Sequence, residues 1–129
     1  MMKTMIRLAV ISILMMLAAP AWSASAVGVY WCQQGDGASE ADVDAAATAW
    51  LKAAKAVKGG ENLEVEIMYP LAATMGDNDF LFLVKTPSIA EWGEFMDNYE
   101  GDAVADEDKK FAEVAGCADS ALWESVKIK

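Results

Sequence analysis

The side chains of this chain best suited to binding chemistry are its large aromatics. An apolar ligand pocket needs broad hydrophobic walls with a few polar tips, which Tyr and Trp provide. The candidates for such a ligand-binding site are Tyr30, Trp31, Tyr69 and Trp123. Trp92 could join them, but Trp50 and Trp92 fall on helical stripes and are expected in the core. The alternative for every one of these aromatics is a place in the hydrophobic core or in a subunit interface.

The residue types that this chain lacks exclude several common catalytic mechanisms. The 129 residues contain no His, and Arg7, close to the amino terminus, is the only Arg. His is the commonest general base and Arg the usual bidentate clamp for anions, so Ser-His and Cys-His nucleophiles and His-ligated haem or zinc are excluded. Asp, Glu, Lys and Tyr remain, but each needs a buried setting to shift its pKa usefully. The sequence therefore assigns no catalytic residue, no metal and no cofactor.

Acidic side chains suggest two further kinds of site, each with a simpler alternative. Glu64 and Glu66 could act as a carboxylate pair, but alternating Glu is also typical of the solvated face of an edge strand. A run of acids could offer oxygen ligands to calcium, but it does not fit the spacing of a twelve-residue calcium loop. We expect a solvated loop there. The run consists of Asp97, Glu100, Asp102, Asp106, Glu107 and Asp108.

The amino terminus has the three-part layout of a secretion signal. Lys3 and Arg7 precede an apolar run over residues 8–19, and Pro20 follows it. Two small-residue cleavage patterns come next, at residues 21–23 and 24–26. The run is shorter than the roughly 20 residues that a spanning helix needs, although an uncleaved anchor is the alternative. The sequence predicts a cleaved signal over residues 1–26, one domain over 27–129, and a periplasmic or secreted protein.

Charge limits the partners of this domain. The chain has a net charge of −10, and loss of Lys3 and Arg7 with the signal takes it to −12. Such a field repels nucleic acid and anionic lipid, so neither nucleic acid nor a membrane is expected as a partner after cleavage. It favours solubility or a basic protein partner.

Cys32 and Cys117 are the two cysteines of the chain. Disulfides persist in exported proteins, so the sequence predicts a structural bridge between them. A redox-active pair is the alternative, but such pairs are usually close together as Cys-X-X-Cys.

Hydrophobic periodicity predicts the elements that carry these residues. Strands are predicted over 27–33, 63–69 and 80–84, and a closing strand carries Leu122, Val126 and Ile128. Helices are predicted over 40–58 and 88–99, each after a capping box, Ser39 with Asp42 and Ser88 with Glu91. A further short helix is predicted around residues 106–115, after the acidic loop.

The resulting order is β-α-β-β-α-β, the ferredoxin-like pattern of an α+β domain. Right-handed crossovers then place both helices on one face of a four-stranded antiparallel sheet. The first and third strands are central, in agreement with their apolar residues on both faces, and the first strand pairs with the last. This pairing brings Cys32 beside Cys117, within reach of a bridge.

Two helices leave the other face of the sheet uncovered. In this respect the chain resembles the dimeric α/β-barrel group, whose ferredoxin-like domains pack sheet on sheet in pairs. The resemblance covers nearly all of the chain after the signal, but it has no signature motif, so it transfers no functional residue. The group includes cofactor-free monooxygenases, haem-handling proteins and lyases.

The sequence therefore favours an exported, non-catalytic binding or interaction module, a homodimer through its sheet. It does not identify the ligand, for which a small apolar molecule and a basic protein are the candidates. One alternative is a cofactor-free enzyme similar to the small monooxygenases, with an aromatic pocket at the open sheet face. Another is an acidic partner or inhibitor of a basic protein, whose binding would weaken steeply with salt.

Overall fold

The computed structural model describes residues 24–72, 76, 79–100 and 102–129. Most of the predicted signal, residues 1–23, lies outside the described residues, as does part of the turn predicted at residues 75–79. The elements, in chain order, are β1 (Ser25–Gln34), α1 (Glu40–Lys55), β2 (Glu64–Met68), β3 (Asp79–Thr86), α2 (Ile89–Asn98), α3 (Asp102–Val114) and β4 (Ala115–Ser125).

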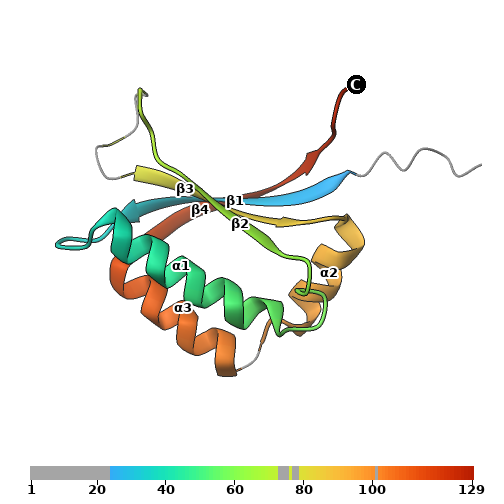
Figure 1. Ribbon diagram of the computed structural model, residues 1–129, viewed down its shortest axis with the longest axis horizontal. Helices are drawn as coiled ribbons and strands as arrows, with labels where there is room; N and C mark the ends of the chain where they lie inside the picture. Colours follow the sequence, from blue (N-terminus) through green and yellow to red (C-terminus); the bar gives the residue numbers. More distant parts are fainter. Residues whose placement is uncertain (1–23, 73–75, 77–78, 101) are drawn as a thin grey trace, which may run out of the picture.

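The four strands form one antiparallel sheet in the order β2-β3-β1-β4. All three helices lie on one face of this sheet, and α1 and α3 run side by side (Figure 1). The predicted ferredoxin-like α+β fold is confirmed, with β1 and β3 at the centre and with one helix more than its basic pattern.

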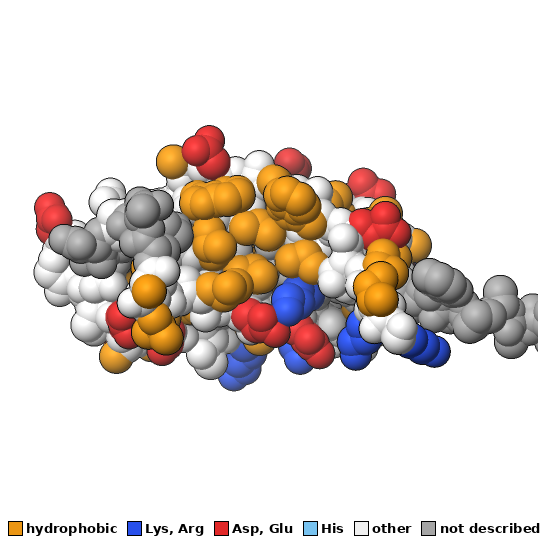
Figure 2. Space-filling model, turned by 90° about the horizontal axis from the view of Figure 1, so that it is seen from above, with side chains coloured by type: hydrophobic (Ala, Val, Ile, Leu, Met, Phe, Trp, Pro, Cys, Tyr) orange, Lys and Arg blue, Asp and Glu red, His pale blue; other side chains and the backbone are white. Residues whose placement is uncertain are grey.

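Burial alternates along β3, because successive side chains point to opposite faces of the sheet. Phe80, Phe82 and Val84 are buried beneath the helices, whereas Leu81 and Leu83 point to the other face and stay half-buried. Because directly paired strand residues share a face, the pairing continues this division into β1, where even-numbered residues from Gly28 to Cys32 face the helices. We call the side without helices the open face, and hydrophobic side chains gather at its centre (Figure 2).

Helix boundaries follow the predicted capping chemistry. Ser39 Oγ accepts a hydrogen bond from the Asp42 N–H at 3.2 Å, and the Asp42 carboxylate accepts one from the Ser39 N–H at 2.8 Å. Ser88 Oγ likewise accepts a hydrogen bond from the Glu91 N–H at 3.1 Å. The Glu91 carboxylate, however, accepts from the Ser88 hydroxyl and not from the Ser88 backbone N–H. After α1, Gly59 has φ 89°, a conformation that favours glycine, and a Cβ there would overlap the backbone of Phe95.

Cys32 and Cys117 form the predicted disulfide. The two residues pair directly across β1 and β4, beside an irregularity in register between Trp31 and Cys32. Their Cα atoms lie 3.9 Å apart, closer than the usual range for bridged cysteines. The bridge joins the end of β1 to the beginning of β4, as the strand order requires.

Two predicted elements need correction, both in the last quarter of the chain. The third helix begins at Asp102, earlier than the predicted start around residue 106, and Asp97 lies in α2, so of the six acids of the expected loop only Glu100 is outside a helix. The last strand runs over Ala115–Ser125, earlier than predicted, and Val126 and Ile128 follow it outside any strand. The first residues of this strand are small or polar and have low strand propensity. The strand begins there because these residues pair with β1.

Reduction of the disulfide tests its part in stability. The bridge closes a sequence separation of 85 residues. The chain-entropy model then predicts that reduction lowers the free energy of unfolding by about 4 to 5 kcal/mol. Urea unfolding with and without reductant measures this loss. The double variant Cys32→Ala/Cys117→Ala is the control, and its midpoint should not respond to reductant.

Processing of the amino terminus can be predicted more finely from β1. Cleavage after Ala26 would remove Ser25 and Ala26 from the strand, although Ala26 is fully buried and pairs with both neighbouring strands. Cleavage after Ser23 would leave β1 whole. If the predicted signal is cleaved, we therefore expect the remaining chain to begin at Ala24, as amino-terminal sequencing would show; a chain beginning at Val27 would contradict this.

Candidate functional site

A partly open cavity of about 270 Å³ lies between the helix-covered face of the sheet and the three helices. Its walls are almost entirely aromatic or apolar, with a single carboxylate among them. We call it the aromatic cavity, and it is lined by Tyr30, Trp50, Phe82, Val84, Trp92, Phe95, Met96, Tyr99, Asp108, Phe111 and Cys117.

Asp108 is the centre of a polar cluster in the wall of the cavity. Trp50 Nε1 donates a hydrogen bond to Asp108 Oδ1 at 2.7 Å. The Tyr99 hydroxyl lies 2.6 Å from Oδ1 and 2.7 Å from Oδ2, and it donates to this carboxylate. Each member comes from a different helix: Trp50 from α1, Tyr99 from the end of α2 and Asp108 from α3. The cluster therefore joins the three helices at the cavity.

Aromatic rings pack closely around this cluster, in edge-to-face and tilted pairs. The ring centroid of Trp50 lies 5.7 Å from that of Phe82, and the two ring planes are almost perpendicular. Phe82 also meets Phe111 at 5.1 Å, and Phe95 meets Tyr99 at 5.3 Å. Such contacts hold the walls in defined rotamers, so the cavity has a fixed shape.

Trp92 closes one side of the cavity because a glycine makes room for it. The indole lies directly against Gly28 of β1, and a Cβ at that position would overlap Cη2 of the ring. Gly28 thus allows the ring to approach the sheet backbone closely.

Both tyrosines of the cavity keep their protons at unusually high pH. Burial raises the pKa of Tyr30, and the nearby charge of Asp108 raises it further. Burial also raises the pKa of Tyr99 strongly, and its hydrogen bond to Asp108 adds to this shift. At neutral pH the cavity therefore presents two neutral phenol groups.

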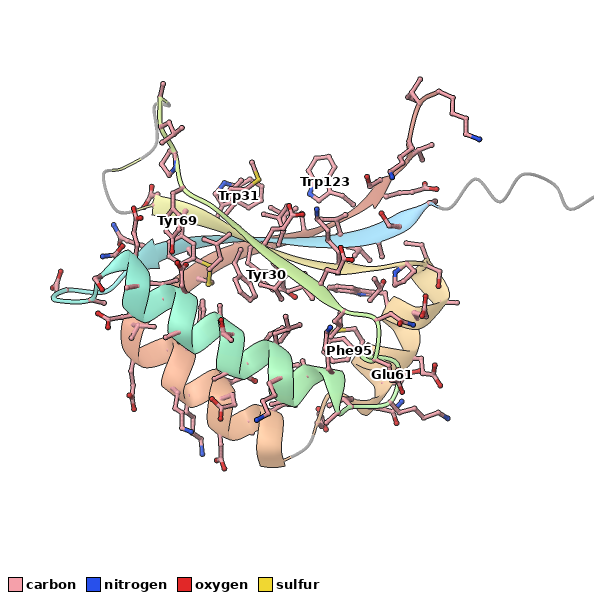
Figure 3. All side chains as sticks on the ribbon, viewed as in Figure 1. Tyr30, Trp31, Glu61, Tyr69, Phe95 and Trp123 are labelled. Atoms are coloured by element: carbon pink, nitrogen blue, oxygen red, sulfur yellow. A yellow bond between two sulfur atoms is a disulfide. The ribbon has the colours of Figure 1, made fainter. Side chains whose placement is uncertain are left out.

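The structure does not bring the four predicted ligand residues together. Tyr30 faces the helices and lines the aromatic cavity, whereas Trp31 and Trp123 stand on the open face (Figure 3). Tyr69 follows β2 and lies on α1, where its hydroxyl donates to Asp44 Oδ1 at 2.8 Å. It lines a separate shallow groove against that helix.

Sequence reasoning missed most of the cavity. Trp50 and Trp92 do pack against the core, as predicted, but they also form cavity walls. Asp108 belongs to an acidic run for which a solvated position is predicted, and nothing in the sequence connects it with Tyr99. A helical spacing of Val104, Asp108 and Phe111 was the available signal, because it places the acid on the apolar stripe of α3.

Other kinds of site find little support in the described part of the chain. No group of three or more Cys, Asp or Glu there could hold a metal ion. Glu66, one of the two strand carboxylates, is paired with Lys85 at 2.8 Å on the open face. No helix among the described residues is long and apolar enough to cross a membrane.

Comparison with solved structures identifies the fold. The chain is similar to SnoaB, a cofactor-independent oxygenase from Streptomyces nogalater, with a TM-score of 0.55 and 6% identity over 81% of this chain and 96% of SnoaB. It is also similar to a dimeric ferredoxin-like protein of unknown function from Thermobifida fusca, with a TM-score of 0.49 and 13% identity over 81% of this chain and 92% of the other. A protein of unknown function from Bacteroides thetaiotaomicron, described as a possible oxidoreductase, has a TM-score of 0.47 and 9% identity over 80% and 99% of the two chains.

At these identities the likeness establishes the fold alone. The chain resembles the dimeric α/β-barrel ferredoxin-like proteins in architecture. No protein-family model matches the sequence, and no curated protein matches it either.

Titration of the tyrosines tests this electrostatic description. All three tyrosines of the chain have raised pKa values, and Tyr69 owes its shift to burial and to its bond with Asp44. Native protein should therefore show almost no phenolate absorbance near pH 10, where tyrosines of the unfolded chain are half-ionised. The associated stability is complete below that pH and is lost as the pH rises further. A native phenolate signal near pH 10 would contradict the buried cluster.

Proposed function

We propose that the protein is an exported, non-catalytic binding protein that holds a small, largely apolar molecule in the aromatic cavity and acts as a homodimer. The observation that carries this proposal is the aromatic cavity with its single polar cluster. Ligand sites are typically apolar hollows in which a few placed polar groups orient the ligand.

The size of the cavity suits a compact ligand. An apolar cavity of about 150 Å³ is enough to bind benzene. The aromatic cavity, at about 270 Å³, has room for a substituted ring or a branched molecule of similar size. Its rigid ring walls need little reorganisation to bind such a molecule, which keeps the entropic cost of binding low.

The open face supports the dimer. Trp31, Met68 and Trp123 stand there with exposed fractions of 41%, 52% and 55%. They surround half-buried residues of the two central strands, and together these side chains make the hydrophobic area in Figure 2. Contiguous apolar surface of this kind usually marks an interface. A second copy packed face to face would bury the same residues on both subunits.

A cofactor-independent oxygenase is the second candidate. Two observations favour it: the fold likeness to SnoaB, and the position of Asp108, whose carboxylate could accept a proton from a bound substrate. Turnover separates the two candidates. Oxygen consumption with a bound phenolic compound would support the enzyme, and binding without consumption would support the binding protein.

Substitution of Gly28 tests the cavity as the binding site. Gly28→Ala should push the Trp92 ring into the cavity, because the new methyl group occupies its place. We expect the affinity for the neutral probe tert-butylbenzene to fall by about tenfold or more, a change of about 1.4 kcal/mol. Quenching or a shift of tryptophan fluorescence measures binding, since Trp50 and Trp92 line the site.

Gly116→Ala is the matched control for that experiment. Gly116 is also a strand glycine, but a Cβ there meets nothing within 4 Å. Its variant should bind the probe as the wild type does. Equal binding by wild type and Gly28→Ala would remove the cavity as the site.

Two neighbouring residues of β4 test the dimer. Trp123 points to the open face and Leu122 to the helix side, with exposed fractions of 55% and 51%. Trp123→Glu places a charge in the proposed interface and should yield monomers in sedimentation analysis, whereas Leu122→Glu should remain dimeric. A monomeric wild type, or a dimer that only Leu122→Glu disrupts, would refute an interface on the open face.

A further inference from the structure

We infer that the ligand of the aromatic cavity is a small organic cation, a protonated or quaternary amine, held by the surrounding ring faces and by the carboxylate of Asp108. This inference rests on the proposed binding function and adds the chemical class of the ligand.

The first support is a carboxylate with no cationic partner. Both groups that donate to Asp108, the Trp50 indole and the Tyr99 hydroxyl, are neutral. The three ion pairs in the described part of the chain are Lys58 with Glu94, Lys85 with Glu66 and Lys110 with Glu107. None of them involves Asp108, and no Lys or Arg is among the residues that line the cavity. A carboxylate without a counter-charge in an apolar wall is unfavourable, and a cationic ligand would offset that cost.

Hydrogen-bond capacity leaves room for this ligand. An ionised carboxylate is an acceptor only and offers about four lone-pair positions. Trp50 and Tyr99 supply only two protons to Asp108. The remaining positions could accept from a protonated amine, or could face a quaternary ammonium as a point charge.

The ring walls supply the second support. The faces of Trp, Tyr and Phe rings carry negative electrostatic potential and attract organic cations, Trp most strongly. Two Trp rings, two Tyr rings and three Phe rings line this one cavity. Several rings around one carboxylate form the kind of cage that binds quaternary and methylated amines.

Electrostatics around the cavity agree with this assignment. Burial raises the pKa of both Tyr30 and Tyr99, and the neighbouring Asp108 raises it further. The chain as a whole carries a net charge of −10, which raises the local concentration of cations near its surface. An anionic ligand would meet repulsion from both sources.

A metal ion is a poorer match for the same charge. Hard metal ions need several oxygen ligands at once. No metal-binding group of three or more acidic or cysteine side chains exists among the residues that the structure describes. The cavity instead surrounds one carboxylate with hydrocarbon and ring surface, which suits an organic cation.

Three probes of matched shape test the inference on the processed, full-length protein. Phenyltrimethylammonium and tert-butylbenzene differ only in the charge of one central atom, and benzenesulfonate is the anionic counterpart. We expect the cation to bind about tenfold more tightly than the neutral probe, and the anion not to bind measurably. Calorimetry at low and moderate salt measures all three.

Asp108→Asn should lower the affinity for the cation and leave the affinity for the neutral probe unchanged, while the ring faces retain a smaller part of the preference. Asparagine keeps a carbonyl acceptor for Trp50 and Tyr99, so the fold of the wall is preserved. Asp106→Asn removes the same charge from an exposed position of α3 and should keep the tenfold preference. Equal losses in the two variants would mean that general surface charge attracts the cation, and would overturn the inference.

The outcomes separate the two proposals. If the neutral probe binds as tightly as the cation, the charge assignment is wrong and the binding function stands. If no probe binds, both proposals fail.

Discussion

The pairing of β1 with both β3 and β4 is the constraint on which the rest of the structure depends. β1 is a central strand of the sheet, so successive side chains along it point to opposite faces of the sheet. Tyr30 thereby faces the helices and the cavity, while Trp31 joins the open face. The next residue, Cys32, is bridged to the beginning of β4. One strand thus contributes to the ligand site, the proposed dimer surface and the covalent cross-link.

The sheet and the three helices together form the aromatic cavity. β1 and β3 provide its floor, but its polar cluster exists only because α1, α2 and α3 converge on Asp108. Buried polar groups are stable when they are hydrogen-bonded, and here the Trp50 indole and the Tyr99 hydroxyl both find the same carboxylate. The arrangement joins the three helices and places the carboxyl group of Asp108 in the wall of the cavity. In the proposed binding protein, one cluster would therefore combine a structural and a binding role.

Local patterns predicted most of the fold. The capping box at Ser39 is governed by neighbouring residues and was predicted correctly, whereas at Ser88 the N-cap is confirmed but Glu91 does not accept from the Ser88 backbone N–H. The bridge between Cys32 and Cys117 followed from strand order. The beginning of β4 was missed because its first residues have little strand propensity and are held by β1. Of the four predicted ligand residues only Tyr30 lines the cavity, and the expected position of an aromatic pocket, the open face, was wrong because the cavity lies between the sheet and the helices. Residues from three helices cannot be brought together by spacing alone.

The sequence by itself determined the order of elements, the absence of His-based chemistry, and the acidic character of the chain, because these depend on composition and short-range periodicity. Tertiary structure alone decided which aromatics meet. Trp31 and Trp123 share their residue types with Trp50 and Trp92, yet the first pair lies on the open face and the second pair lines the cavity. It also decided that Asp108 joins Trp50 and Tyr99. Such contacts depend on how helices far apart in the chain pack on a shared sheet face, and no local interaction encodes that packing.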